Sequence, residues 1–162
     1  MDASIYMTDA RSFFSAVRSA AQDVAHLERV IRRMAANEGP RGGGGSVHGS
    51  GIGDPMAPTD ARLDYEARVS VRLDDDYTLV DLGAAVLYGR DQMGGGGVCA
   101  ILGGKVADCC WWRYCAGERW TVTAEMVGMS ERWCRDACER ACETVDALGF
   151  AAVLDGRGMA ED

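Results

Sequence analysis

Residues 112–138 read WRYCAGERWTVTAEMVGMSERWCRDAC, and this stretch decides the fold. Ala124, Gly128 and Cys134 stand at fixed offsets within it, Gly128 four positions after Ala124 and Cys134 six positions after Gly128. A small residue such as Ala124 lets two helices cross closely, Gly128 permits the positive φ of a tight turn, and Cys134 buries the back of the following helix. The spacing therefore predicts two helices joined as a helix-turn-helix.

Capping residues set the expected limits of the helices around this turn. A preceding helix, which starts near Ile101, should end at Gly117 because glycine suits the left-handed position that closes a helix. The next helix is expected over 121–127 with Thr121 as its cap. The last should start at Ser130, whose hydroxyl can accept from free backbone amides, and run to about Leu148. The result is a three-helix domain.

Two longer helices are predicted before this domain, at 9–37 and 59–92. Apolar residues recur in both at alternating spacings of four and three, which is typical of a coiled-coil seam. The seam residues are Phe13, Val17, Ala20, Val24, Leu27, Ile31 and Met34 in the first helix and Leu73, Tyr77, Val80, Ala84 and Leu87 in the second.

Charge indicates how these two helices pair. Residues 10–37 carry five arginines and two acids, net +3, whereas residues 59–91 carry four arginines and eight acids, net -4. Opposite charge beside two apolar seams favours an antiparallel hairpin. Parallel self-association of either helix is the competing arrangement.

The predicted class is all-α, with a coiled-coil-like hairpin over 9–92 followed by the helix-turn-helix domain over 98–149. Glycine-rich residues 39–58 should form a flexible linker inside the hairpin, because this composition buries too little apolar area to offset its ordering entropy. The glycine run at 93–97 is expected to be a hinge between the two domains. Residues 150–162 are expected to be a C-terminal tail.

A family resemblance rests on the string Trp112-Arg113-Tyr114-x-x-Gly117-x-x-Trp120-x-x-x-Ala124-x-x-x-Gly128-x-Ser130. It resembles the signature of sigma-70 region 4-like domains, in which isoleucine usually stands where this chain has Thr123. The layout of the whole chain is similar to that of short phage and prophage proteins, among them late-gene transcription regulators. The resemblance implies a prophage-derived, DNA-binding transcription regulator, with double-stranded DNA and RNA polymerase as partners and the long helices making a homo-oligomer.

Four residues are the predicted DNA contacts. Helix-turn-helix proteins insert the N-terminal end of the last helix into the major groove. Arg132 is therefore expected on a guanine edge or a phosphate, and Arg135 on a phosphate, because a guanidinium fork matches both groups. Ser130 and Arg119 are expected on the DNA backbone.

Net charge argues for a second interpretation. The chain carries a formal charge of -8, whereas lysine and arginine normally supply most of the affinity for DNA. An acidic protein-interaction or phage-assembly module, built on a helix-turn-helix scaffold without DNA binding, is therefore the alternative.

Other site classes are not expected. We find no Ser/His/Asp or Cys/His constellation, so the chain is predicted not to be an enzyme and to need no cofactor. Cysteines recur on one face at Cys134, Cys138 and Cys142, but no CxxC pair occurs and both histidines lie far away, so reduced, buried thiols are expected in place of zinc ligands. Neither a secretory signal nor an 18-residue apolar run is present, so a cytoplasmic protein without a membrane partner is expected.

Overall fold

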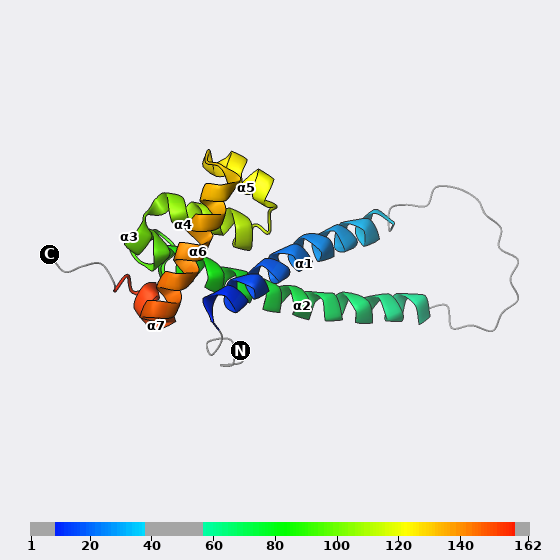
Figure 1. The fold of residues 1–162 in the computed structure, drawn as a ribbon. Coiled ribbons are helices and arrows are strands. Elements are labelled where there is room, and N and C mark those ends of the chain that lie inside the picture. Colours follow the sequence, from blue (N-terminus) through cyan, green and yellow to red (C-terminus); the bar gives the residue numbers. More distant parts are fainter. Residues whose placement is uncertain (1–8, 38–56, 158–162) are drawn as a thin grey trace, which may run out of the picture.

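The computed structural model describes residues 9–37 and 57–157, and these residues contain helices and no strand. The predicted all-α class is confirmed. Helices α1 (Ala10–Ala36) and α2 (Ala57–Tyr88) run in opposite directions, and the shorter helices gather around one end of the pair (Figure 1). We call the opposite end, residues 20–36 of α1 and 57–78 of α2, the arm. The expected linker at 39–58 lies outside the described residues, except for 57–58, which begin α2.

Helix α1 begins where the sequence predicts. Asp9 is its N-cap, and Oδ1 of Asp9 accepts a 2.9 Å hydrogen bond from the amide of Ser12. The seam residues nearest the body are buried, among them Phe13 and Val17, whereas Ile31 in the arm is exposed. The two helices pack closely at Gly83 of α2, where a Cβ would lie 2.7 Å from Cγ1 of Val17.

Helix α2 ends at Tyr88, earlier than the expected Gln92. Gly89 follows with φ of 95°, a conformation that ends the helix because residues with a Cβ rarely adopt it. Its amide still donates to the carbonyl of Ala85 at 2.7 Å.

The glycine run at 93–97 is not the expected hinge. Helix α3 (Gly97–Leu102) starts inside it, and Gly97 is buried with φ of 69°. A Cβ on Gly97 would lie 2.6 Å from the carbonyl oxygen of Val86, and one on Gly96 would lie 2.4 Å from that of Leu154. These glycines let backbone pack on backbone, so the run joins α2 tightly to α3. The expectation was wrong because the composition of a glycine run does not show whether the run is flexible or tightly packed.

The predicted helix before Gly117 is broken. Gly103, with φ of 97°, separates α3 from α4 (Gly104–Cys110), and α4 continues into a π-helical turn, η2 (Trp111–Cys115). Gly117 has φ of 73° and closes this segment as predicted. Helix α5 (Trp120–Val127) and helix α6 (Glu131–Leu148) follow.

Part of the expected C-terminal tail is structured. Helix α7 (Phe150–Leu154) folds back after Gly149, and its Val153 is fully buried. The ring of Phe150 lies 4.9 Å from that of Phe13 in an edge-to-face contact. The apolar string FAAVL explains this packing, because it can cover the core only if it turns back at the glycine.

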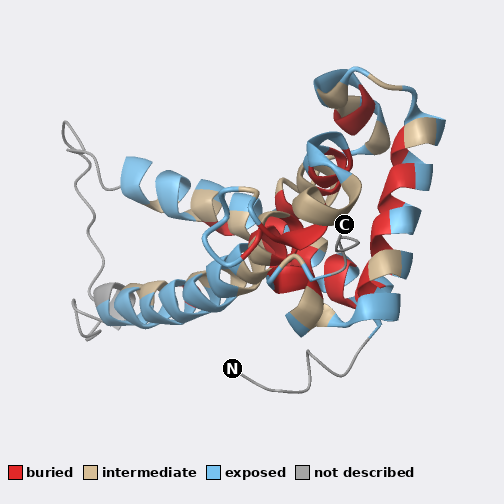
Figure 2. Ribbon diagram, turned by 90° about the vertical axis from the view of Figure 1, so that its left-hand side faces the viewer, coloured by how far each residue is buried: buried red, intermediate tan, exposed pale blue. Residues whose placement is uncertain are grey.

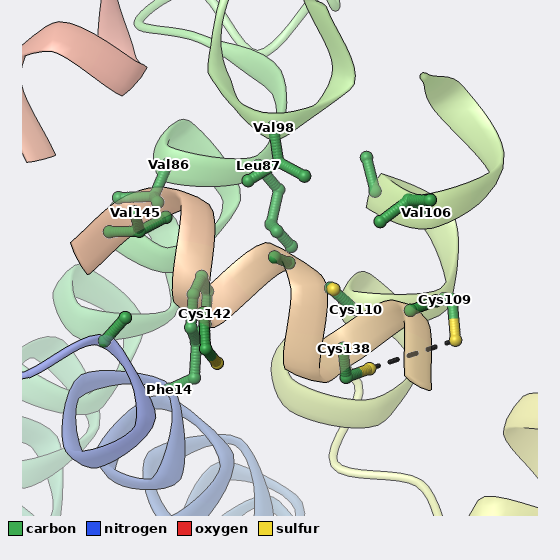
Figure 3. Close-up of a cluster of buried hydrophobic side chains, with 14 of the residues drawn as sticks. Phe14, Val86, Leu87, Val98, Val106, Cys109, Cys110, Cys138, Cys142 and Val145 are labelled. Atoms are coloured by element: carbon green, nitrogen blue, oxygen red, sulfur yellow. Dashed lines mark hydrogen bonds between the residues drawn. The ribbon is translucent and has the colours of Figure 1, made fainter. Parts of the chain in front are cut away.

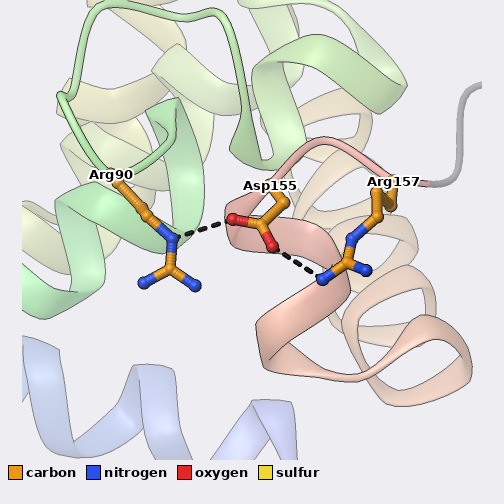
Figure 4. Close-up of polar contacts among 3 residues, drawn as sticks. All are labelled: Arg90, Asp155 and Arg157. Carbon is orange, nitrogen blue, oxygen red and sulfur yellow. Dashed lines mark hydrogen bonds and ion pairs between the residues drawn. The ribbon is translucent and has the colours of Figure 1, made fainter.

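An ion-pair bridge ties α7 to the end of α2 (Figure 4). Nε of Arg90 lies 2.8 Å from Oδ1 of Asp155, and Nη2 of Arg157 lies 2.7 Å from Oδ2. Both guanidinium groups hold the pKa of Asp155 below its ordinary value.

One core unites the described helices. It is formed by buried residues of α1, α2, α3, α4, η2, α5, α6 and α7. Buried positions are red on the ribbon of Figure 2, and some of the side chains are drawn in Figure 3. The ring of Phe14 in α1 stacks on that of Tyr114 in η2, 5.0 Å away. The expected division into a hairpin and a separate helix-turn-helix domain is therefore replaced by one body from which the arm projects.

Candidate nucleic-acid interface

The turn between α5 and α6 has the geometry that its residues predict. Gly128 is left-handed, with φ of 74° and ψ of 31°, and the amides of Gly128 and Met129 donate to the carbonyl of Ala124 at 2.8 and 3.1 Å. Oγ of Ser130 accepts from the amide of Trp133 at 3.1 Å, which caps α6. Ala124 and Cys134 are buried on either side of the turn.

Thr121 is not the cap of α5. Arg119 occupies the N-cap position, and no side chain caps the first amides of this helix. Thr123, in the place where the resembling domains usually have isoleucine, is fully buried. Its Oγ1 donates to the carbonyl of Arg119 at 3.0 Å, so the buried hydroxyl keeps a hydrogen-bond partner.

Helix α6 has one buried face and one open face (Figure 2). The buried face consists of Cys134, Ala137, Cys138, Ala141, Cys142 and Val145. Ser130, Arg132 and Arg135 are exposed. The N-terminal end of α6, which the sequence predicts as the groove-reading end, is therefore open to solvent.

Two acidic residues in the later turns of α6 contact the start of α1. Arg11 forms an ion pair with Glu139. Oδ1 of Asp146 accepts the amide of Ala10 at 2.7 Å. Although residues 130–148 carry a net charge of -2, some of the negative charge is thus used in packing, away from Arg132.

Two arginines lie over the ring of Trp120, the first residue of α5. The guanidinium carbon of Arg135 lies 4.9 Å from the centroid of the Trp120 ring, and that of Arg113 lies 4.2 Å from it. Cations over an indole face are attracted by its quadrupole, so the ring orients both groups. Arg119 precedes Trp120 in the chain and is exposed. Ser130 and Arg132 lie about one turn before Arg135 on α6.

Two further arginines belong to this region and were missed from the sequence. Nη1 of Arg113 donates to the carbonyl of Glu118 at 3.1 Å, and Nη2 of Arg18, from α1, lies 3.5 Å from the same oxygen. Arg113 stands inside the signature string, so attention to its polar positions could have found it. Arg18 had no such signal, because it lies 100 residues from Glu118 in the chain and only the packing of α1 brings it there.

Arg18, Arg113 and Arg135 place three positive charges close together. The pKa of Arg113 is lowered, first by burial and then by the nearby charges of Arg18 and Arg135. Across residues 9–37 and 57–157, no carboxylate forms an ion pair with any of these three guanidinium groups. Arginine nevertheless stays protonated at neutral pH, so the cluster brings three positive charges together without an ion pair to any of them.

The cysteines are packing residues. All seven thiols are free, and every one except Cys99 is buried. Sγ of Cys109 and Sγ of Cys138 lie 3.9 Å apart between α4 and α6 (Figure 3). Burial raises the pKa of Cys142 to about 11 and that of Cys115 to about 12. In the described part of the chain, no group of three or more His, Cys, Asp or Glu side chains is placed to hold a metal ion.

All four tryptophans are half-buried. Trp111, Trp120 and Trp133 pack against the core, and Trp112 lies edge-to-face on Trp111 with ring centroids 5.0 Å apart.

Comparison of the chain with protein-family models, with curated proteins and with solved structures finds no match. Among the described helices, none is both long enough and apolar enough to cross a lipid bilayer.

Proposed function

We propose that this protein is a DNA-binding transcription regulator that reads the major groove with the N-terminal end of α6. The observation that carries the proposal is the pairing of α5 and α6 across a left-handed Gly128 with the exposed arginines Arg132 and Arg135 at the start of α6. This is the arrangement by which helix-turn-helix proteins place side chains on base edges. A regulator of this kind acts in the cytoplasm.

Each arginine has a proposed role. Arg132, in the first turn of α6, reaches a guanine edge or a phosphate, and its fork can donate two hydrogen bonds to O6 and N7 of guanine. Arg135, held over Trp120, binds a backbone phosphate. Arg119 and Ser130 lie at the starts of α5 and α6 and touch the DNA backbone, Ser130 while also capping α6.

The formal charge of -8 limits how strongly the whole chain can attract DNA. Long-range attraction to DNA is weak for an acidic protein, so affinity depends on the local arginines and falls steeply with salt. A sequence-specific site, rather than general attraction to DNA, is therefore the proposed target. The resemblance to sigma-70 region 4 adds RNA polymerase as a proposed partner and a prophage as the proposed origin.

The arm is the proposed site of self-association. Leu63 and Val71 of α2 are 57% and 63% exposed there. The exposed charged residues of α1 in the arm are Arg29, Arg32 and Arg33, whereas those of α2 are four acids, including Asp64, against two arginines. Two arms packed antiparallel place α1 of one copy against α2 of the other, which buries the apolar residues and pairs opposite charges.

Titration of the full chain with labelled promoter fragments tests DNA binding, measured by fluorescence anisotropy at about 50 and 200 mM salt. We expect Arg132→Ala with Arg135→Ala to abolish specific binding and leave the oligomer unchanged. Arg140→Ala removes the same charge from a later turn of α6 and is the matched control. Absence of binding by the unaltered chain at about 50 mM salt refutes the proposal, because phosphate contacts are strongest there.

The exposed apolar side chains of the arm also favour a second candidate function, an acidic interaction or phage-assembly module without DNA binding. Leu63→Glu combined with Val71→Glu separates the two. If the DNA-binding function is right, the variant loses the oligomer in analytical ultracentrifugation but keeps the contacts of each α6 with DNA. An unaltered chain that forms assemblies and never binds DNA supports the second candidate.

A further inference from the structure

Three arginines from three separate elements converge beside the first turn of α5. Arg18 comes from α1, Arg113 from η2 and Arg135 from α6, and we call them the arginine triad. We propose that the arginine triad is an anion site that holds one phosphate of the DNA backbone, so that α1 is part of the DNA interface. This inference rests on the proposed function and adds a contact that reads no sequence.

In the described part of the chain, the hydrogen-bond acceptors around the triad are neutral oxygens, and no carboxylate forms an ion pair with it. The carbonyl of Glu118 is 3.1 Å from Nη1 of Arg113 and 3.5 Å from Nη2 of Arg18. The amide oxygen of Gln22, with the amide turned to accept, is 3.0 and 3.1 Å from Nη1 and Nη2 of Arg18. Nε of Arg18 and Nε of Arg113 are buried, and neither has a hydrogen-bond partner. Buried donors without a partner are costly, and a neutral carbonyl does not compensate two or three positive charges.

Trp120 orients two arginines of the triad before any ligand arrives. Its ring lies under the guanidinium groups of both Arg113 and Arg135, at 4.2 and 4.9 Å from their carbon atoms. An oriented guanidinium loses less side-chain entropy when it binds a phosphate, and its planar fork can donate two hydrogen bonds at once. The site is therefore preorganised for an oxyanion.

Position favours a DNA phosphate over other oxyanions. The triad adjoins the start of α5, an eight-residue helix whose first amides have no side-chain cap. Such free amides and the helix dipole attract a phosphate in the same place. Arg135 also lies one helical turn from Arg132, the proposed base contact, so one duplex can engage both.

A salt titration tests the triad with Arg18→Gln, which lies outside the helix-turn-helix. Each phosphate contact contributes about 0.9 to the slope of log K against log salt, so the slope should fall by about that amount. Affinity should fall about threefold to tenfold at about 50 mM salt and equally for all DNA sequences. Arg140→Gln removes the same charge from a later turn of α6, outside both the arginine triad and the arm, and should leave the slope unchanged. Circular dichroism checks that both variants fold.

The outcomes separate this inference from the proposed function. If the unaltered chain binds DNA and Arg18→Gln leaves its salt slope unchanged, the arginine triad is refuted and the proposed function stands. If the unaltered chain does not bind DNA, both are refuted. Arg113→Lys adds a second test, since it keeps the charge and loses the fork, and it should weaken binding less than Arg113→Gln does. Should the Arg113 variants fail to fold, Arg18→Gln decides the matter alone.

Discussion

The backbone amide of Ala10 donates a 2.7 Å hydrogen bond to Oδ1 of Asp146, although 136 residues separate them in the chain. This bond joins the first residue of α1 to the last turns of α6. A carboxylate at the start of a helix also interacts favourably with the helix dipole and with the free amides of the first turn. The proposed groove-reading helix and the start of α1 are therefore held as parts of one body.

We predict that Asp146→Ala lowers the free energy of unfolding by about 1 to 2 kcal/mol, because it removes a charged acceptor from a buried amide. Urea unfolding followed by circular dichroism at pH 7 measures it. Asp136→Ala is the control, since Asp136 is exposed on the same helix, and it should change stability by less than about 0.5 kcal/mol. Equal effects of the two substitutions would contradict the role given to Asp146.

The crossing of α1 and α2 should be sensitive to one methyl group. A Cβ added at Gly83 would lie 2.7 and 3.0 Å from the two Cγ atoms of Val17, closer than real contacts allow. Gly83→Ala should therefore destabilise the chain by about 1 to 3 kcal/mol through overpacking. Thermal unfolding measures the loss.

Val17→Ala provides the matched test at the same crossing. Alone it leaves a small cavity and should also destabilise, by about 1 to 3 kcal/mol. Combined with Gly83→Ala it makes room for the new methyl group, so the double variant should be more stable than the two single effects predict by addition. Strictly additive losses would mean that the two sites do not touch.

Asp76 of α2 should limit stability at neutral pH. Burial, then a hydrogen bond with Asp23 and the charge of Asp23, raise the pKa of Asp76 to about 6, and one of its carboxylate oxygens is buried without a partner. Arg72 binds Asp23 instead, with Nε 2.6 Å from Oδ2 of Asp23. Between the ordinary value of 3.8 and about 6, the folded chain holds a proton that the unfolded chain has lost. This group's contribution to stability therefore rises as pH falls through 6.

We predict that Asp76→Asn stabilises the chain by about 1 kcal/mol at pH 7.5, the lower end of the range for an unsatisfied buried group, because the site is partly solvated. The gain should shrink at pH 5, where Asp76 of the unaltered chain takes up its proton. Urea unfolding at both pH values measures it. Asp75→Asn, at an exposed neighbouring position, should show no such pH dependence. A gain of the same size at both pH values argues against the raised pKa.

Alkaline pH should destabilise the fold steeply. Burial raises the pKa of Cys142 to about 11 and those of Cys115 and Cys134 to about 12, from an ordinary value of 9.0. Above pH 9 the unfolded chain releases thiol protons that the folded chain keeps, so stability falls as pH rises from about 9 towards those values. Each such thiol contributes up to about 1.4 kcal/mol per pH unit.

Urea midpoints at pH 8, 9 and 10 under reducing conditions test this dependence. Cys142→Ala removes one titrating thiol and should flatten the decline, even though the cavity it leaves lowers stability at every pH. Cys99→Ala is the control, because Cys99 is the half-exposed thiol. A pH dependence that neither substitution changes would assign the alkaline loss to other groups.

The sequence by itself determined the local elements. Periodicity gave the two long helices, Gly128 and Ser130 gave the turn and the cap of α6, and the buried positions of α6 followed from its spacing. These features depend on backbone conformation and on side chains a few residues apart, which is the range over which a sequence pattern carries information. Arg132 and Arg135 lie on the exposed face of α6, between its buried positions.

Only the tertiary structure decided how these elements combine. The glycine run at 93–97 could have been a hinge, and close backbone contacts with Val86 and Leu154 made it a packed junction. The string that forms α7 became part of the core because Phe150 meets Phe13. Arg18 joined the arginine triad because α1 packs on η2. Such contacts join residues far apart in the chain, and their free energy comes from burial and charge in the assembled core, which no local pattern encodes.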